Sequence, residues 1–263
     1  MLRWRRSLQL GFLGLTLVAV FLVGGHAERW CPFGGVESLY AFLTEGQLLC
    51  SLGVSNLYIL GGVLFMTLLL RRAFCGYVCP VGAISEETRR LGRRLGIKTF
   101  RVPERWERWL SWLPLAVLGV ILFITFRASE LLFRGFDPCY ALIGRHGEDI
   151  TAWAYVVAGG LVLGSLVVTL PFCRWLCPFV PVLNLFSRFA PARVRRDTER
   201  CRDCGNCRRV CPMNLPVDRV REVSAARCTS CLECLDACPT AAQGSLSWGW
   251  SRGRAVRWPR PVL

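Results

Sequence analysis

Charged residues are scarce in this sequence: Asp, Glu, Lys and Arg supply only 19% of its 263 residues, whereas 53% are apolar. Because soluble domains typically carry about 25% charged and about 45–50% apolar residues, this composition argues against an ordinary soluble domain and favours a membrane protein. Acidic residues are the scarcer kind, with 18 against 33 basic residues and a net charge of +15. No basic–aromatic motif accompanies this charge, so we expect no nucleic-acid partner, but basic loops that contact anionic membrane lipid.

Four apolar stretches are long enough to cross a hydrocarbon core of about 30 Å. They cover approximately Leu8–Gly25, Gly53–Leu70, Trp109–Phe126 and Trp153–Phe172. The first follows three arginines, as a signal peptide would, but its apolar run is long and the possible cleavage site after it is weak. We therefore expect it to remain as a membrane anchor.

Basic residues are divided unevenly between the segments that connect these spans. The N-terminus, residues 71–108 and everything after Phe172 hold nearly all of them. The two opposite loops hold Arg29, Arg127, Arg134 and Arg145 against Glu28, Glu37, Glu45, Glu130, Asp137, Glu148 and Asp149. The positive-inside rule predicts a multi-pass protein of the bacterial cytoplasmic (inner) membrane with both termini in the cytoplasm.

An internal repeat organises the apolar part of the chain. Each unit has one cysteine in an outer loop, Cys31 or Cys139, and then, after a span, the motif Phe-Cys-x3-Cys-Pro at residues 74–80 or 172–178. The sequence predicts a mainly α fold, a four-helix transmembrane bundle of two parallel repeats followed by a bacterial-ferredoxin-like module. The expected bounds are 1–190 for the membrane domain (repeats about 8–95 and 109–190), 191–200 for a linker, 201–242 for the module and 243–263 for an irregular basic tail.

Eight of the fifteen cysteines form two runs of the pattern Cys-x2-Cys-x2-Cys-x3-Cys-Pro. This spacing is typical of two [4Fe–4S] clusters, in which the fourth cysteine of each run ligates the other cluster. One cluster is expected on Cys201, Cys204, Cys207 and Cys238, and the second on Cys228, Cys231, Cys234 and Cys211. A zinc ribbon fits four cysteines per run poorly. Thiolate-bound iron needs a reducing compartment, which agrees with a cytoplasmic module.

The two Cys-x3-Cys-Pro motifs supply four further thiols, Cys75, Cys79, Cys173 and Cys177. On a helix, cysteines four residues apart lie on one face, so each pair can present two sulfurs in one direction. Four thiolates are the number that a [4Fe–4S] cluster takes, and the two pairs could share one. In one alternative Cys31 joins the pair of its own repeat and Cys139 does likewise. In the other the pairs are buried thiols or disulfides without metal.

The outer loops contain groups that can exchange protons or bind metal. Only two histidines occur, His26 and His146, and both lie there together with Cys31 and Cys139. We consider His146, Glu37, Tyr40 and Glu148 as candidates for proton acceptors at a quinol site. Cys31 and Cys139 could form a disulfide, bind a metal or cluster, or stay unpaired.

Four spans, two Cys-x3-Cys-Pro motifs and a two-cluster module together resemble the NapH/MauN ferredoxin-type membrane proteins. The C-terminal part of NosR and the CcoG/FixG accessory proteins are similar. The resemblance covers nearly the whole chain up to about Ala242, and both sets of cysteines match the family's motifs. It implies that the protein passes quinol electrons towards a periplasmic reductase. No large periplasmic flavin domain precedes the spans, unlike in NosR, so the resemblance does not imply a flavin.

We therefore predict a membrane-bound electron-transfer subunit between the quinone pool and a partner redox protein, periplasmic or membrane-bound. It could act as the quinol dehydrogenase subunit of an electron-transfer complex. The alternatives are a maturation factor that reduces copper or a disulfide for a respiratory enzyme, and a regulatory iron–sulfur protein. The direction of electron flow stays open, because cluster potentials range from about −700 to about +450 mV.

Overall fold

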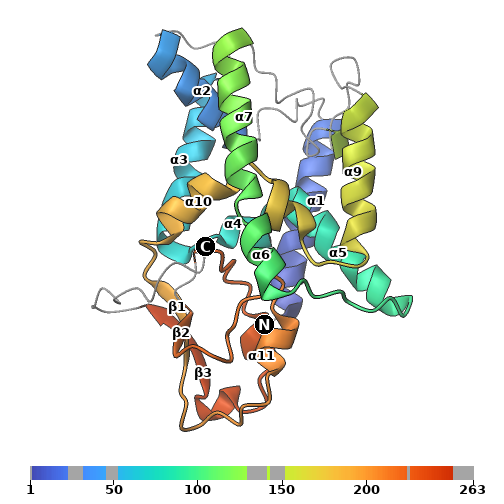
Figure 1. Cartoon of the computed structure of the whole chain (residues 1–263), viewed down its shortest axis with the longest axis vertical. Coiled ribbons are helices and arrows are strands. Elements are labelled where there is room, and N and C mark those ends of the chain that lie inside the picture. Colours follow the sequence, from blue (N-terminus) through green and yellow to red (C-terminus); the bar gives the residue numbers. More distant parts are fainter. Residues whose placement is uncertain are drawn as a thin grey trace.

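The computed structural model describes residues 2–22, 32–45, 53–128, 141–142, 152–223 and 226–250. The fold is mainly helical, with long helices at one end and a small sheet at the other (Figure 1). The helices are α1 Leu2–Phe21, α2 Pro32–Glu45, α3 Gly53–Leu70, α4 Ala73–Tyr77, α5 Pro80–Arg94, α6 Glu104–Leu110, α7 Leu113–Ala128, α9 Ala152–Ser165, η3 Phe172–Leu176, α10 Val180–Ser187, α11 Asn206–Val210, α12 Glu233–Asp236 and η4 Ala241–Gln243. The strands are β1 Ala192–Arg196, β2 Glu222–Val223 and β3 Leu246–Trp250.

The four predicted spans correspond to α1, α3, α7 and α9, but their helices differ in length. Within the described ranges, only the stretch Glu104–Arg127 is long and apolar enough to cross a membrane, whereas Ser55–Leu70 and Ala152–Ser165 are apolar but shorter. The fourth span was expected to reach Phe172, yet α9 ends at Ser165. Leu170 has a positive φ of 53° and precedes a proline, a combination that does not continue an α-helix. The four-helix transmembrane bundle therefore stays a prediction.

Small residues let α2 approach α3 closely. A Cβ placed on Gly35 would lie 2.6 Å from the Asn56 carbonyl oxygen and 2.8 Å from the Leu60 side chain. A larger residue would force the two helices apart, as at other close helix contacts built from small residues. Phe33 on α2 and Leu60 on α3 are buried in the same apolar cluster as Cys75.

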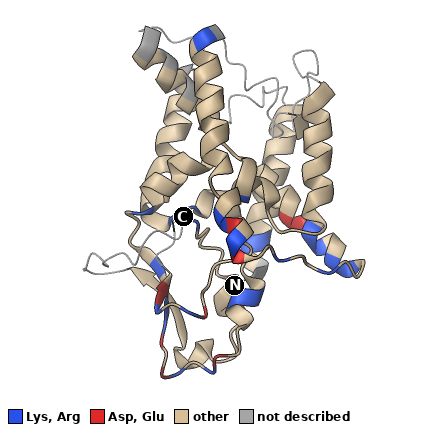
Figure 2. Cartoon of the chain, viewed as in Figure 1, with Lys and Arg blue, Asp and Glu red and all other residues tan. Residues whose placement is uncertain are grey.

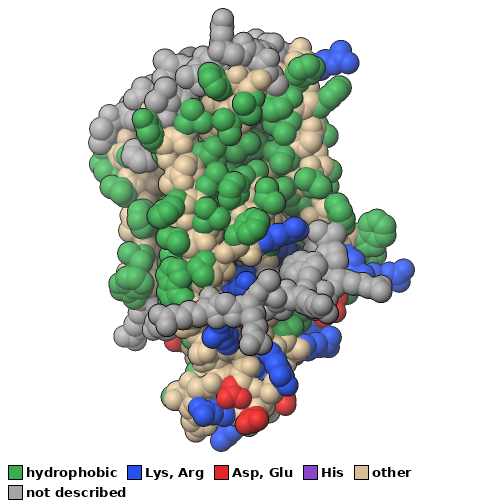
Figure 3. All heavy atoms as spheres, turned by 90° about the vertical axis from the view of Figure 1, so that its left-hand side faces the viewer, with side chains coloured by type: hydrophobic (Ala, Val, Ile, Leu, Met, Phe, Trp, Pro, Cys, Tyr) green, Lys and Arg blue, Asp and Glu red, His purple; other side chains and the backbone are tan. Residues whose placement is uncertain are grey.

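Charged side chains gather at one end of the molecule. Figure 2 shows them around α5, α6, the start of α1 and the module, whereas the long helices above are almost free of charge. In Figure 3 apolar side chains cover the surface of the helical part, and charged ones cover the module. Exposed large apolar residues include Leu15, Tyr58, Phe65, Phe123 and Trp153. Such a surface is typical of contact with lipid rather than water.

The module contains a three-stranded antiparallel sheet in the order β2-β1-β3. Val194 of β1 pairs with Val223 on one side and with Trp248 on the other. Two expectations differ from this structure: part of the 191–200 linker is β1, and part of the irregular 243–263 tail is β3. β1 pairs with β2 residues 27 to 29 positions away in the chain and with β3 residues 50 to 58 positions away, and such partners decide strand formation more than local sequence does.

Candidate metal centres

The first two cysteines of each run lie in loops with the same backbone course, and the third lies on the short helix that follows, Cys207 on α11 and Cys234 on α12. The second and fourth residues after the first cysteine have a positive φ in both loops: Asp203 50°, Gly205 67°, Ser230 49° and Leu232 59°. Three of these are not glycine, so the surrounding structure must hold them there. Left-handed residues in such a loop turn successive N–H groups inward and form the anion-binding concavities found at iron–sulfur sites. Each loop then enters a short helix, α11 or α12, as expected.

The structure places the fourth cysteine of each run beside the other run. Cys207 has the Cys201 and Cys238 thiols as electrostatic neighbours. Cys211 has Cys228 as a neighbour, and it is in turn a neighbour of Cys231 and Cys234. We call the first group, with the exposed Cys204 on the same loop, site A, and the second group site B. These neighbours are those expected of crossed ligation.

Sites A and B differ in burial and in the groups that surround the sulfurs. Burial raises the pKa of Cys211 in site B to about 11, and the Cys228 thiol raises it as well. In site A, Arg196 of β1 donates from Nε to the Cys201 sulfur at 3.2 Å, and the Ser245 hydroxyl lies 3.2 Å from the Cys238 sulfur. Hydrogen bonds to thiolate sulfurs tune the potential of a cluster.

The two Cys-x3-Cys-Pro motifs share one local structure. In each, the second cysteine donates its N–H to the phenylalanine carbonyl five residues earlier, Cys79 to Phe74 and Cys177 to Phe172, both at 2.9 Å. The pairs were expected on one helical face, but the second cysteine instead has extended backbone, with φ −62° and ψ 120° at Cys79 and φ −66° and ψ 116° at Cys177. The proline that follows excludes the helical conformation there.

Cys211, which also precedes a proline, has nearly the same backbone conformation, with φ −63° and ψ 115°. The Cys-Pro step of the apolar part of the chain thus repeats the Cys-Pro step of the module. A conformation that presents a thiol to a cluster in ferredoxin-type runs is therefore also present at both paired motifs.

The four thiols of the two motifs, which we call the quartet, lie in one buried region. Burial raises the pKa of Cys173 well above its usual range, and the neighbouring Cys79, Cys75 and Cys177 thiols raise it further. Cys177 likewise has Cys75 and Cys79 as neighbours. No group of three or more described His, Cys, Asp or Glu side chains could hold a single metal ion. A four-iron cluster is larger than one ion, so its ligands stand farther apart. Ligation by the quartet stays a prediction.

Two consecutive arginines lie between the quartet and site B, and the side chains of both are almost completely buried. The Arg72 Nη2 atom donates to the Cys173 carbonyl at 3.0 Å and lies 3.9 Å from the Cys75 sulfur. Its Nε is buried and has no hydrogen-bond partner among the described residues. The Arg71 side chain donates to the Ala192 carbonyl at 2.7 Å and has the Cys228 thiol as an electrostatic neighbour.

The segment that carries the first Cys-x3-Cys-Pro motif packs directly on the loop of site B that begins at Cys228. The Arg72 N–H donates to the Cys228 carbonyl at 3.3 Å, and the Tyr77 hydroxyl donates to the Ser230 carbonyl at 3.1 Å. A Cβ on Gly76 would lie 3.3 Å from the Thr229 carbonyl oxygen, so the backbones are in close contact. The module is therefore seated on the end of the helices that carries the quartet.

A buried ion-pair network holds the module against this end of the helices. The Arg5 side chain of α1 donates to the Glu86 carboxylate of α5, to the Glu233 carboxylate of α12 at 2.7 Å and to the Gly76 carbonyl at 3.3 Å. Burial raises the pKa of Glu86, although the Arg5 charge lowers it. One arginine near the N-terminus thus joins three parts of the chain.

The outer-loop candidates lie almost entirely outside the described residues. This applies to His26, Cys31, Cys139, His146, Glu148 and Asp149. Glu37 and Tyr40 lie on α2; Tyr40 is half-buried, and the Glu37 side chain is outside the described part. The quinol site therefore stays a prediction.

Sequence reasoning missed Arg5, Arg71 and Arg72, because arginines beside an apolar span were interpreted only as markers of membrane orientation. One sequence signal was available: Arg71 and Arg72 stand immediately before the Phe-Cys-x3-Cys-Pro motif, where a cation can meet the thiolates.

Two family models match the chain. A model described as a 4Fe-4S binding domain matches residues 52–98 and again 150–196, and each match contains one pair of the quartet. A model described as a 4Fe-4S dicluster domain matches residues 193–239, which contain sites A and B. No solved structure matches the chain.

Several curated proteins are similar to the chain. YccM of Escherichia coli, named as an electron transport protein, is 32% identical over 226 residues, which are 82% of this chain but only 62% of YccM. The ferredoxin-type protein NapH of Haemophilus influenzae is 27% identical over 89% of this chain and 85% of its own length. The methylamine utilization ferredoxin-type protein MauN of Methylobacillus flagellatus is 30% identical over 69% of this chain and 60% of its own length. The chain is thus a homologue of NapH, MauN and YccM and belongs with the ferredoxin-type proteins that carry 4Fe-4S domains.

Proposed function

We propose that this protein is a membrane-bound electron-transfer subunit that links the quinone pool to a partner oxidoreductase. In this proposal Cys201, Cys204, Cys207 and Cys238 hold one [4Fe–4S] cluster, and Cys228, Cys231, Cys234 and Cys211 hold a second. The quartet holds a third. A [4Fe–4S] cluster takes up and releases electrons at a potential set by its surroundings.

The residues at all three sites fit such a group. The two loops of the module turn N–H groups towards the space between their cysteines, because each loop contains two left-handed residues. At the quartet, the buried Arg72 Nε lacks a partner among the described residues, although an unsatisfied buried donor is costly. An anionic cluster held by the quartet thiolates would accept a hydrogen bond from Arg72 and would balance its charge.

One observation carries the proposal: the three cysteine sites follow one another without a gap from the helices to the module surface. The quartet contacts site B through Arg72, Gly76 and Tyr77. Site B lies beside site A, because Cys234 and Cys207 are buried in the same apolar cluster, and site A ends at the exposed Cys204.

A single apolar cluster encloses this series of sites. Leu161, Leu170 and Phe172 from the helical part pack in the same cluster as Met213 and Val223 of the module. Cysteines of the quartet, of site A and of site B belong to it as well. Such packing excludes water between the sites, which lowers the reorganisation that accompanies movement of charge.

Membrane insertion is supported by the distribution of side chains. The long helices expose apolar surface, and the charges lie at one end (Figures 2 and 3). The positive-inside rule assigns this end, with the module, to the cytoplasm. The electron-transport name of YccM and the ferredoxin-type names of NapH and MauN support the same function.

The proposal is tested by reducing the anaerobically purified protein with a quinol analogue while its visible and paramagnetic spectra are recorded. We expect quinol to reduce clusters that dithionite also reduces. Glu37→Gln and His146→Ala should each slow reduction by quinol at least tenfold and leave reduction by dithionite unchanged, with Glu45→Gln as the matched control. Failure of quinol to reduce any cluster would contradict the link to quinone. If neither variant has an effect, the outer location of the quinol site is wrong.

A further inference from the structure

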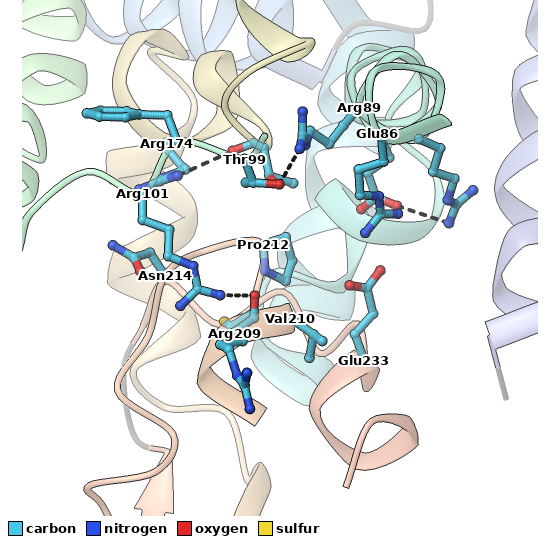
Figure 4. Close-up of a pocket in the computed structure, with 15 residues that line it drawn as sticks. Glu86, Arg89, Thr99, Arg101, Arg174, Arg209, Val210, Pro212, Asn214 and Glu233 are labelled. Carbon is cyan, nitrogen blue, oxygen red and sulfur yellow. Dashed lines mark hydrogen bonds and ion pairs between the residues drawn. The ribbon is translucent and has the colours of Figure 1, made fainter. Parts of the chain in front are cut away.

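Arginines line a cavity where α5, the segment 97–103, η3 and the module meet. The cavity has a volume of about 100 Å³, and Figure 4 shows the side chains around it. Six arginines line it: Arg89, Arg90, Arg93, Arg101, Arg174 and Arg209. The only carboxylates among its lining residues are Glu86 and Glu233.

Internal ion pairs account for only part of this charge. Glu86 and Glu233 both bind Arg5, which lies outside the cavity lining. Arg174 pairs with Glu107, and Arg90 pairs with Glu87 and, more distantly, with Glu86.

The other four arginines form no ion pair with any carboxylate in the part of the chain that the structure describes. They are Arg89 and Arg93 of α5, Arg101 of the connecting segment and Arg209 of α11. Arg209 contributes its carbonyl, which accepts from Arg101, whereas its guanidinium donates to the Cys204 carbonyl and to Asn206. Arg89, Arg93 and Arg101 thus line the cavity without a carboxylate partner among the described residues.

Neutral groups hold two of these cations: Arg89 donates to the Leu166 and Ile97 carbonyls and to the Thr99 hydroxyl, and Arg101 donates to the Arg209 carbonyl. Two further observations show that this leaves their charge uncompensated. Arg89 is only 3% exposed, and its Nε is buried without a hydrogen-bond partner among the described residues. The pKa of Arg101 is lowered by burial and then by the charges of Arg208 and Arg209, so like charges repel one another here. An anion in the cavity would relieve both conditions.

We propose that this cavity binds the phosphate group of an anionic phospholipid. A phosphate-sized group suits its volume, and arginine guanidinium groups bind phosphate oxygens in bidentate geometry. Basic pockets beside membrane helices on the cytoplasmic side are typical sites for anionic head groups. The inference rests on the membrane insertion that the proposed function requires.

The neighbouring surface favours a lipid over free phosphate. Leu91 of α5, Leu95 directly after α5 and Phe100 of the next segment are exposed near the arginines, and so are Trp106 and Trp109 of α6. Exposed apolar and aromatic side chains next to basic ones are typical of a segment at the membrane surface. The acyl chains of the lipid can cover the exposed apolar and aromatic side chains while its phosphate group enters the cavity.

A bound phospholipid would join separate parts of the protein. Arg89 and Arg93 belong to α5, Arg101 to the connecting segment and Arg209 to the module beside Cys211 of site B. The lipid therefore fastens the module to the membrane surface, in addition to the Arg5 network.

Nanodiscs that contain the full chain test this proposal in three arms: phosphatidylcholine alone, phosphatidylcholine with phosphatidylglycerol, and phosphatidylcholine with inorganic phosphate in the buffer. The measurement is hydrogen exchange of α5 and of residues 97–103. Phosphatidylglycerol should protect these segments in the wild-type protein, and Arg93→Gln combined with Arg101→Gln should weaken its binding on the order of tenfold. Arg195→Gln combined with Arg202→Gln removes two exposed charges elsewhere on the module and should leave the binding within about twofold.

Equal effects of the two double variants would overturn the proposal, because surface charge alone would then explain the binding. Equal protection by inorganic phosphate would assign the site to a free anion and would overturn the lipid. Absence of protection in the wild-type protein would overturn both. Failure of the chain to enter nanodiscs would instead contradict the proposed membrane function.

Discussion

The module sites and the quartet use the same thiol chemistry but are built in different ways. In sites A and B, three of the four cysteines come from one short segment with its own left-handed residues. The quartet takes two thiols from each half of the chain, about 100 residues apart, and each pair comes from a short helical turn that ends at a proline. Local sequence builds the first kind of site, and tertiary packing builds the second.

This difference has a consequence for stability and electrostatics. The module loops lie partly at the surface, as the exposed Cys204 shows, so water can stabilise a cluster's charge there. The buried Ser245 hydroxyl lies within hydrogen-bond distance of the Cys238 sulfur. The quartet is enclosed, with Cys75 and Cys173 at most 5% exposed, so a buried cation must balance its charge. Arg72 occupies that position.

The largest expected effect follows from removing cysteines of the quartet. Cys79→Ala combined with Cys177→Ala should lower the iron content of the anaerobically purified protein from about twelve to about eight atoms per chain, because each cluster holds four irons. Cys204→Ala should also cost about four irons, but its loss should come from site A. Iron and sulfide analysis with paramagnetic spectra of the remaining clusters measures both changes. A wild-type content of about eight, unchanged in the quartet variant, would mean that the quartet holds thiols without metal.

The same division explains what the sequence could predict. The spacing of the module cysteines is local, so the sequence alone indicated two clusters and the crossing of Cys211 and Cys238. The repeated Cys-x3-Cys-Pro motif could be recognised, but convergence of its two copies depends on how α4, η3 and α10 pack. No local pattern encodes that packing.

Other features lay beyond the sequence because they depend on distant partners. We expected β1 to be part of a linker and β3 to be part of a tail. Neither segment shows a clear strand pattern on its own, because each becomes a strand through pairing with the other. Arg71 and Arg72 stand where the positive-inside rule expects basic residues, but distant partners bury them: Arg72 donates to the Cys173 carbonyl, and Arg71 donates to the Ala192 carbonyl of β1.

The contact between the helices and the module can be tested by substituting two adjacent residues of α1. Arg5 is buried and binds Glu86 and Glu233, whereas the next residue, Arg6, forms a partly exposed pair with Glu87. Arg5→Gln leaves buried carboxylates without their cation and should cost about 3 to 5 kcal/mol, whereas Arg6→Gln should cost less than about 1 kcal/mol.

Hydrogen exchange of α5 and α12 in the full-length protein measures this difference. Arg5→Gln should increase exchange in both helices on the side that faces the quartet, and Arg6→Gln should leave it nearly unchanged. Similar exchange in the two variants would show that Arg5 does not hold the module in place.

The smallest expected effect concerns the cation beside the quartet. Arg72 lies against Cys75 and Cys173, and its charge favours whichever redox state of the quartet site is more negative. Arg72→Gln removes this charge and should lower the reduction potential of that site on the order of 60 mV, which corresponds to a tenfold change in a one-electron equilibrium. Arg72→Lys keeps the charge and should shift the potential less, even though its shape differs. A redox titration followed by paramagnetic resonance separates this site from sites A and B, whose potentials should move little because Arg72 meets site B only through its backbone N–H. An equal shift in both variants would assign the effect to geometry rather than charge, and a shift confined to site B would place Arg72 with the module instead of the quartet.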